Sequence, residues 1–147
     1  MDLKRFSLLM AAWLVLLGCT GTRPNNLGVK GGELAPCQDS PNCVSTEARD
    51  AKHRIEPLKY STSREEAMRK LTAAIQSMPR RKIVIATENY LHVEFSSAIF
   101  RFVDDVEFFL DDATQTIHFR SASRLGYSDL GVNRKRMEEI RRRFTAQ

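Results

Sequence analysis

The sequence contains no apolar run long enough to cross a membrane. Its longest apolar stretch spans residues 6–17, whereas a membrane-spanning helix needs about 20 apolar residues. Lys4 and Arg5 precede this stretch, and the small Gly18 follows it. A short cationic start, a short apolar run and a small residue before the cleavage point are typical of a secretory signal peptide. The order of these features predicts export.

The end of this stretch, Leu16-Leu17-Gly18-Cys19, resembles a bacterial lipobox. At such a site the cysteine is acylated and the chain is then cut before it. We therefore predict a lipoprotein signal peptide over residues 1–18 and acylation of Cys19, with palmitate among its acyl chains. Several acyl chains anchor a protein durably, whereas one gives only marginal binding. Thr20 stands where an aspartate directs retention in the inner membrane, so we expect an outer-membrane lipoprotein that faces the periplasm. The alternative is an ordinary cleaved signal peptide with an incidental cysteine.

Cysteine is scarce, with three residues in the chain. If Cys19 carries lipid, Cys37 and Cys43 remain as a pair in an oxidising compartment, where disulfides form. The rival interpretation is a metal site completed by His53. The five residues between the two cysteines do not match the spacing of a standard zinc knuckle. A disulfide is therefore favoured, and we expect no metal and no other cofactor.

The chain is basic, with 23 Lys and Arg against 18 Asp and Glu. An exported protein meets the cell envelope and not the genome, so this charge does not indicate nucleic-acid binding. Removing residues 1–18 leaves 21 cationic and 17 acidic residues, a net charge of +4. Residues 134–143 account for this excess, since they carry six cationic residues and two acidic ones. The sequence thus concentrates its positive charge near the C-terminus.

The composition divides the chain behind the signal peptide into two parts. Residues 19–33 are rich in glycine and asparagine and poor in apolar residues, which predicts a flexible tether between the lipid and a folded domain. Residues 34–147 provide enough chain for a single domain with one modest core.

Two helices are predicted from apolar spacing. Ser63 and Glu66 form a capping box, apolar residues then recur at helical spacing, and Pro79 ends the run, so the first helix spans about residues 64–78. We expect Asn133 to be the N-cap of the second helix. The apolar stripe of that helix consists of Met137, Ile140 and Phe144.

Between the helices, apolar and polar residues alternate. Four such segments between Arg81 and Ser123, joined by short turns, predict an antiparallel meander, and a short strand within residues 54–60 joins its edge. The predicted fold class is α+β, with a four- to five-stranded antiparallel meander and two helices on one face, in the order β-α-β-β-β-β-α. We expect the other face of the sheet to be open to solvent.

Asp104 interrupts this alternation. It has the same parity as Phe102 and Val106, which are apolar. Either Asp104 points into the core toward a cation, or a bulge at Asp104-Asp105 shifts the alternation. An unpaired buried carboxylate is very costly, so the first alternative requires a cationic partner.

The start of the second helix is cationic. Arg134, Lys135 and Arg136 occupy its first turn, where the helix dipole is already positive, so negative charge is expected nearby. Two interpretations remain open. In one, the acids of the preceding strands and loop, with Glu107 among them, neutralise the arginines; in the other, the arginines and serine hydroxyls bind an anionic ligand. This anion-binding or ion-pair cluster comprises Asp104, Asp105, Arg120, Ser121, Ser123, Arg124, Tyr127, Asp129, Asn133, Arg134 and Arg136.

Enzymatic interpretations have less support. Serines near His118 and Asp129 supply the residue types of a hydrolytic triad, but the chain lacks a G-x-S-x-G elbow. His118 and Ser121 lie three residues apart on a strand and face opposite sides, so they cannot pair directly. His92, Glu94 and His118 are explained by the polar face of the sheet, and a metal site there is the lesser alternative.

Four segments resemble the signature blocks of the bacterial family called domain of unknown function 1499. They are "PCQDSPNCVS", "HRIEPL", "FRFVDDVEFF" and "RSASRLGYSDLGVNRKRMEEIR". The resemblance extends from Leu34 to Phe144, with Gln38 in place of the proline expected in the first block. It implies a small envelope or organelle-associated domain without an established catalytic activity. It marks Gly126 and all eleven cluster residues as signature positions.

Together these patterns predict a lipid-anchored protein of the cell envelope that is a noncatalytic binding or structural module. The membrane is one partner, through acylated Cys19. An anionic envelope ligand or an acidic protein surface is the other expected partner, at the arginine-rich cluster. The alternative function is a hydrolase-like periplasmic enzyme that uses the same polar residues. The oligomeric state does not follow from the sequence.

Overall fold

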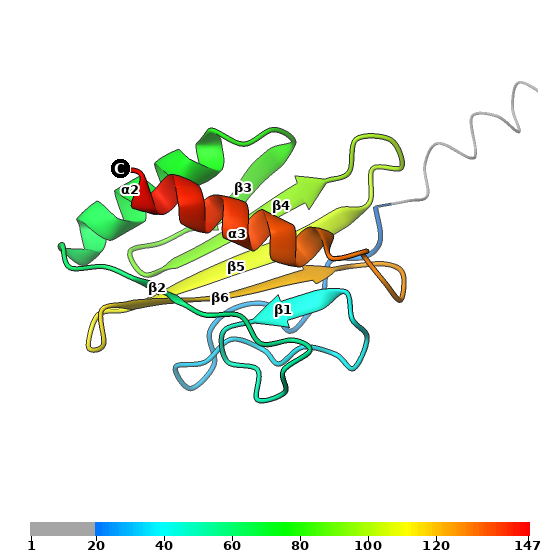
Figure 1. Cartoon of the computed structure of the whole chain (residues 1–147), viewed down its shortest axis with the longest axis horizontal. Helices are drawn as coiled ribbons and strands as arrows, with labels where there is room; N and C mark the ends of the chain where they lie inside the picture. Colours follow the sequence, from blue (N-terminus) through cyan, green and yellow to red (C-terminus); the bar gives the residue numbers. More distant parts are fainter. Residues whose placement is uncertain (1–19) are drawn as a thin grey trace, which may run out of the picture.

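The computed structural model describes residues 20–147, so the predicted signal peptide and Cys19 lie outside the described residues. The elements form an α+β fold in which a mostly antiparallel sheet carries two helices on one face (Figure 1), which confirms the predicted fold class. The elements are β1 (Cys43–Ser45), β2 (Leu58–Lys59), α2 (Arg64–Gln76), β3 (Arg81–Ala86), β4 (Tyr90–Ser96), β5 (Val103–Asp111), β6 (Thr116–Ser123) and α3 (Val132–Thr145).

The sheet follows the order β1-β6-β5-β4-β3, and β2 also pairs with β6. Strands β3 to β6 form the predicted antiparallel meander. The predicted edge strand within residues 54–60 is reduced to β2. The sequence pattern did not predict β1, which begins at Cys43 and pairs with the end of β6. Because β1 has only three residues, its apolar alternation is too short to be recognised.

Helix α2 begins as its capping residue predicts. The hydroxyl of Ser63 accepts a hydrogen bond from the backbone N–H of Glu66 at 3.2 Å. This bond satisfies one of the amides that have no partner within a first helical turn. The apolar stripe of the helix then buries Leu71 and Ile75 completely against the sheet.

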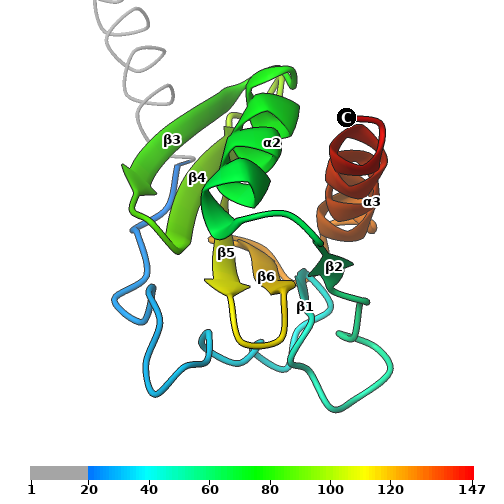
Figure 2. The ribbon, with the colours of Figure 1, turned by 90° about the vertical axis from the view of Figure 1, so that its left-hand side faces the viewer.

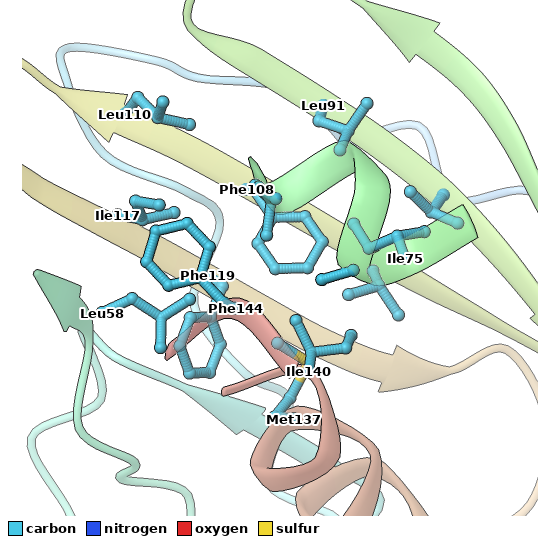
Figure 3. Packing of buried hydrophobic residues seen from close by; sticks show 14 of the residues in the cluster. Leu58, Ile75, Leu91, Phe108, Leu110, Ile117, Phe119, Met137, Ile140 and Phe144 are labelled. Carbon is cyan, nitrogen blue, oxygen red and sulfur yellow. The ribbon is translucent and has the colours of Figure 1, made fainter. Parts of the chain in front are cut away.

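The core lies between the sheet and the two helices (Figure 3). Phe108 of β5 and Phe119 of β6 are fully buried at its centre, and their ring centroids lie 6.2 Å apart. Complete burial of one such side chain stabilises the fold by about 1.5–3 kcal/mol. The predicted stripe of α3 closes the other side of the core with Met137, Ile140 and Phe144.

The N-cap of α3 differs from the prediction. Gly131 caps the helix in a left-handed conformation with φ of 78°, and Asn133 lies within the first turn, fully buried. The backbone N–H of Asn133 instead donates to the carboxylate of Asp129 at 2.7 Å. The capping oxygen therefore comes from Asp129, four residues earlier, because the glycine lets the chain turn back toward the helix start.

The expectation of a solvent-exposed second sheet face is wrong. Residues 23–34, hereafter the covering segment, run on the side of the sheet away from the helices (Figure 2). Arg23 and Gly28 of this segment bond to side chains of β4 and β5. As a result His92 and Glu107 on this face are 1% and 0% exposed. The segment predicted as a flexible tether thus contacts the sheet along part of its length.

Candidate functional site

The sheet divides the predicted cluster between its two faces. Successive residues of a strand point to opposite faces, so Asp104 and Asp105 point to opposite sides of β5. The helix-side cluster comprises Asp104, Ser121, Ser123, Asn133 and Arg136. Asp105, Arg120 and Arg124 lie on the other face, beneath the covering segment. The predicted single cluster is therefore two separate networks.

Asp104 points to the helix side without a bulge, because β5 pairs with β4 in continuous register. Its carboxylate accepts a hydrogen bond from Nη2 of Arg136 at 2.5 Å. The guanidinium of Arg136 also lies 4.9 Å from the ring centroid of Phe95. The side chains of Asp104 and Arg136 are 10% and 11% exposed. This pair joins the N-terminal part of α3 to the start of β5, the central strand of the sheet.

Asn133 organises the rest of the helix-side cluster. Its Oδ1 accepts from the hydroxyl of Ser121 at 2.5 Å and from Arg136 at 2.8 Å. Its Nδ2 donates to the hydroxyl of Ser123 and to the backbone carbonyl of Asn42, at 2.9 and 3.1 Å. Both polar atoms of this buried amide are satisfied. Asn133 therefore connects α3, β6 and the loop before β1.

The network beneath the covering segment, hereafter the covered network, is centred on Asp105. Its carboxylate accepts two hydrogen bonds from Arg124, at 2.7 and 2.8 Å, and one from Nε2 of His92 at 2.8 Å. Arg124 also donates to Glu94 at 2.6 Å, and Arg23 of the covering segment donates to the same oxygen. The chain of contacts therefore alternates acid and base from the sheet interior to the covering segment.

This arrangement keeps Asp105 ionised. Burial disfavours the charged carboxylate, but the hydrogen bonds from Arg124 and His92 outweigh it and lower the pKa of Asp105 to about 2. The hydrogen bonds to Asp105 in turn raise the pKa of Arg124 above its ordinary value. Well above pH 2 both groups are therefore charged, and Asp105 and Arg124 form an ion pair.

Glu107 forms the second half of the covered network. It accepts from the hydroxyl of Tyr90 at 2.8 Å, from the backbone N–H of Gly28 at 2.7 Å and from Arg120 at 3.4 Å. Burial and the neighbouring Glu107 raise the pKa of the Tyr90 hydroxyl, so it remains a donor. Nε of Arg120 is buried without a hydrogen-bond partner within residues 20–147. A cavity of about 160 Å³ lies between the covering segment and the sheet, and Tyr90 and His92 are among the residues that line it.

The remaining predicted cluster residues lie in the loop before α3 and in its first turn. Asp129 accepts from the backbone N–H groups of Gly131 and Asn133, and so its charge is directed at the helix start. Arg134 donates to the backbone carbonyls of Arg54 and Lys52, so the acceptors of these two bonds are not carboxylates. Tyr127 is 73% exposed and belongs to neither network.

The structure confirms the disulfide between Cys37 and Cys43. His53, the predicted rival ligand, is buried and bonds to Asp50 and to the carbonyl of Ser40. Within residues 20–147, no group of three His, Cys, Asp or Glu side chains is placed to hold a metal ion. His118 lies 3.5 Å from the hydroxyl of Thr46, on the face of β6 opposite Ser121.

Sequence reasoning missed several residues of the covered network. Arg23 lies in the segment predicted as a tether, and His92 lies on the face predicted to be solvated. A signal for them exists in the cross-strand register, since Glu107 faces both His92 on β4 and Arg120 on β6. Acids and bases that face each other across three strands indicate a buried network more than a solvated surface.

Fold and site together define a small α+β domain whose sheet carries an internally paired ion network on each face. The chain belongs to the family described as protein of unknown function (DUF1499), whose model matches residues 33–144. This match agrees with the resemblance in the four signature segments. No curated protein matches the chain.

Acid should weaken the covered network. Because the folded-state pKa of Asp105, about 2, lies below its ordinary value of 3.8, its ionised form adds stability above pH 4 that is lost as the pH falls toward 2. We expect this loss to be roughly 2 kcal/mol, measured by urea unfolding at intervals between pH 5 and pH 2. Asp105→Asn should show a shallower pH dependence over this range. If the free energy of unfolding depends on pH equally in both proteins, the lowered pKa of Asp105 is contradicted.

Proposed function

We propose that this protein is a lipid-anchored, noncatalytic module of the bacterial cell envelope, exported by residues 1–18 and acylated at Cys19. The supporting observation in the fold is the occupation of the arginines by internal partners. Arg120, Arg124 and Arg136 each bond to a carboxylate of the sheet. These side chains serve to lock the covering segment and α3 onto the sheet, and they have little capacity left for a soluble anion.

The serine hydroxyls support the same proposal. Ser121 and Ser123 bond to the side-chain amide of Asn133. A hydrolytic serine requires a neighbouring base that accepts its proton, and an amide is not such a base. The hydroxyl of Ser121 therefore acts as a donor in a structural network. A binding or structural role accounts for the cluster residues more fully than the hydrolase-like alternative does.

The location is proposed from the sequence pattern at residues 16–19. Within residues 20–147, no helix has the length and apolar character needed to cross a membrane. Acylation of Cys19 is therefore the proposed attachment to the membrane. The preference for the outer membrane rests on Thr20 following the cysteine.

Cys19→Ser should abolish lipid attachment. In cells fed an alkyne-labelled palmitate analogue, the parental chain should become labelled and should sediment with the membrane fraction. Cys19→Ser should lose the label, because its hydroxyl does not enter the acylation and cleavage sequence, and it should keep residues 1–18. Cys37→Ser is the matched control, since it removes a cysteine of the disulfide and should retain the label. A labelled Cys19→Ser chain would contradict the proposal.

A further inference from the structure

The exposed large apolar side chains of residues 20–147 gather at one end of the molecule. Antiparallel pairing places the β4–β5 loop, the start of β3 and the β6–α3 loop at the same end of the sheet (Figure 1). We call this the loop end. Seven of the eight exposed large apolar residues lie there, and Ile85 on β3 is the exception. The seven are Ile99, Phe100, Phe102, Leu125, Tyr127, Leu130 and Val132.

The β4–β5 loop presents its apolar residues on a closed frame. The backbone N–H of Ser97 donates to the carbonyl of Phe102, and the N–H of Phe102 donates to the hydroxyl of Ser97, both at 2.9 Å. Ile99 and Phe100 at the tip are 82% and 64% exposed. Isolated exposed apolar residues are common, but two on one loop tip with further ones on the neighbouring loop indicate an interaction site.

Cations lie beside this loop. Arg80, Arg81, Lys82 and Arg101 line a cavity of about 340 Å³ together with residues 96–98, and no carboxylate lines it. None of the four cations forms an ion pair with a carboxylate within residues 20–147. Arg80 and Arg101 both have φ of 55°, a region that glycine or asparagine adopts at less cost.

The acidic residues of the loop end are already occupied. Asp104 bonds to Arg136, and Asp129 accepts from the helix start. Glu94 lies between Arg23 and Arg124. The positive charge of residues 80–82 and 101 is therefore not neutralised by the domain itself.

The described chain also begins at the loop end. Gly21 lies so close to the β6–α3 loop that a Cβ atom there would stand 2.9 Å from Cβ of Arg124 and 3.0 Å from Cγ of Leu125. The predicted acylation site, Cys19, is two residues before this contact. An anchor at that cysteine brings the loop end, and not the opposite end, to the lipid surface.

We propose that the loop end docks onto an anionic lipid bilayer. Ile99, Phe100 and the exposed residues of the β6–α3 loop enter the headgroup region, and the cations of residues 80–82 and 101 contact lipid phosphates. Exposed apolar residues with Lys and Arg beside them match a bilayer surface, which offers an apolar interior and negatively charged headgroups together. The inference deepens the proposed envelope location by giving the domain an orientation on the membrane.

A tryptophan at the loop tip tests the docking. Trp13 is the only tryptophan and lies in the predicted signal peptide, so Phe100→Trp with Trp13→Phe places a single probe in the chain. The protein, purified as the cell processes it, is reconstituted into phosphatidylcholine vesicles with or without phosphatidylglycerol. We expect the emission of residue 100 to shift to shorter wavelength and to be quenched by brominated acyl chains when phosphatidylglycerol is present. Ile85→Trp is the matched control, exposed and apolar but away from the loop end, and should show neither change.

The charges are tested in the same assay. Arg81→Glu with Lys82→Glu in the Phe100→Trp chain should reduce quenching to the level of Ile85→Trp, and so should high salt, because exposed charges are screened. Arg49→Glu with Arg69→Glu makes the same change in net charge elsewhere and should leave the quenching unchanged. Thermal unfolding of every variant verifies that the fold is retained.

Three results overturn the inference. The first is equal quenching of the tryptophans at positions 85 and 100. The second is quenching at position 100 that does not depend on phosphatidylglycerol. The third is an equal loss of quenching in the two charge-reversed double variants. Mass spectrometry of the purified chain records acylation of Cys19 separately. An unacylated chain whose residue 100 is still quenched contradicts the anchor but retains the docking surface. An acylated chain without quenching retains the anchor and contradicts the docking surface.

Discussion

Arg124→Ala should lower the free energy of unfolding by about 3–5 kcal/mol, the range measured when one partner of a buried ion pair is removed. The side chain of Arg124 is 7% exposed and that of Asp105 is 1% exposed. Without the guanidinium, Asp105 loses two hydrogen bonds and keeps only that of His92. Water has little access to replace them, because the covering segment lies above the site.

Urea unfolding of Arg124→Ala against the parental chain measures this effect. Arg142→Ala is the matched control, since the side chain of Arg142 is 72% exposed and pairs with Glu139 at the surface; exposed pairs contribute at most about 1 kcal/mol. Adding Asp105→Asn to Arg124→Ala should recover part of the loss, because it removes the unpaired charge. A loss below 1 kcal/mol for Arg124→Ala would falsify the assignment of a buried ion pair.

Arg136→Ala is the second large expected effect. It leaves Asp104 without its cationic partner in the helix-side cluster and removes one donor to Asn133. We expect a loss of about 3–5 kcal/mol in the free energy of unfolding, because the nearly buried carboxylate of Asp104 is left without its cationic partner. The detachment of α3 from β5 should also reduce the unfolding cooperativity.

Arg134→Ala provides the comparison on the same helix turn. Its guanidinium donates to two backbone carbonyls in solvent-exposed bonds. Its removal leaves no buried charge without a partner, so we expect a smaller loss than for Arg136→Ala. Differential scanning calorimetry should therefore rank Arg136→Ala well below Arg134→Ala in melting temperature. The opposite order would show that the helix is held by the loop carbonyls and not by Asp104.

The fold was predictable where the determining contacts are local. Ser63 and the apolar stripe that follows it define α2 from residues within the helix itself. The alternation from Arg81 onward defines strands that pair with the next strand along the chain. The parity of Asp104 identified a carboxylate that needs a cation. It did not identify Arg136 as that cation, because 32 residues separate the two.

The candidate site was predictable only as a list of residues. Charge counting placed Asp105 and Arg124 in the same cluster as Asp104 and Arg136, although the two pairs lie on opposite faces of the sheet. A strand pattern states which residues share a face, but it does not state what covers each face. Charge counting likewise placed the charge excess at residues 134–143, several of which are paired with Glu138 and Glu139. It did not single out the cations of residues 80–82 and 101, which line one cavity that no carboxylate lines.

The sequence by itself determined the helices, the meander and the family, because periodicity, capping and turn residues act over a few positions. It also contains the export and lipobox pattern on which the proposed location depends. Only the tertiary structure decided that the covering segment buries the second sheet face and that separate loops converge at the loop end. Both features arise from contacts between residues far apart in the chain, such as Arg23 with Glu94, and no local pattern encodes which distant segments meet.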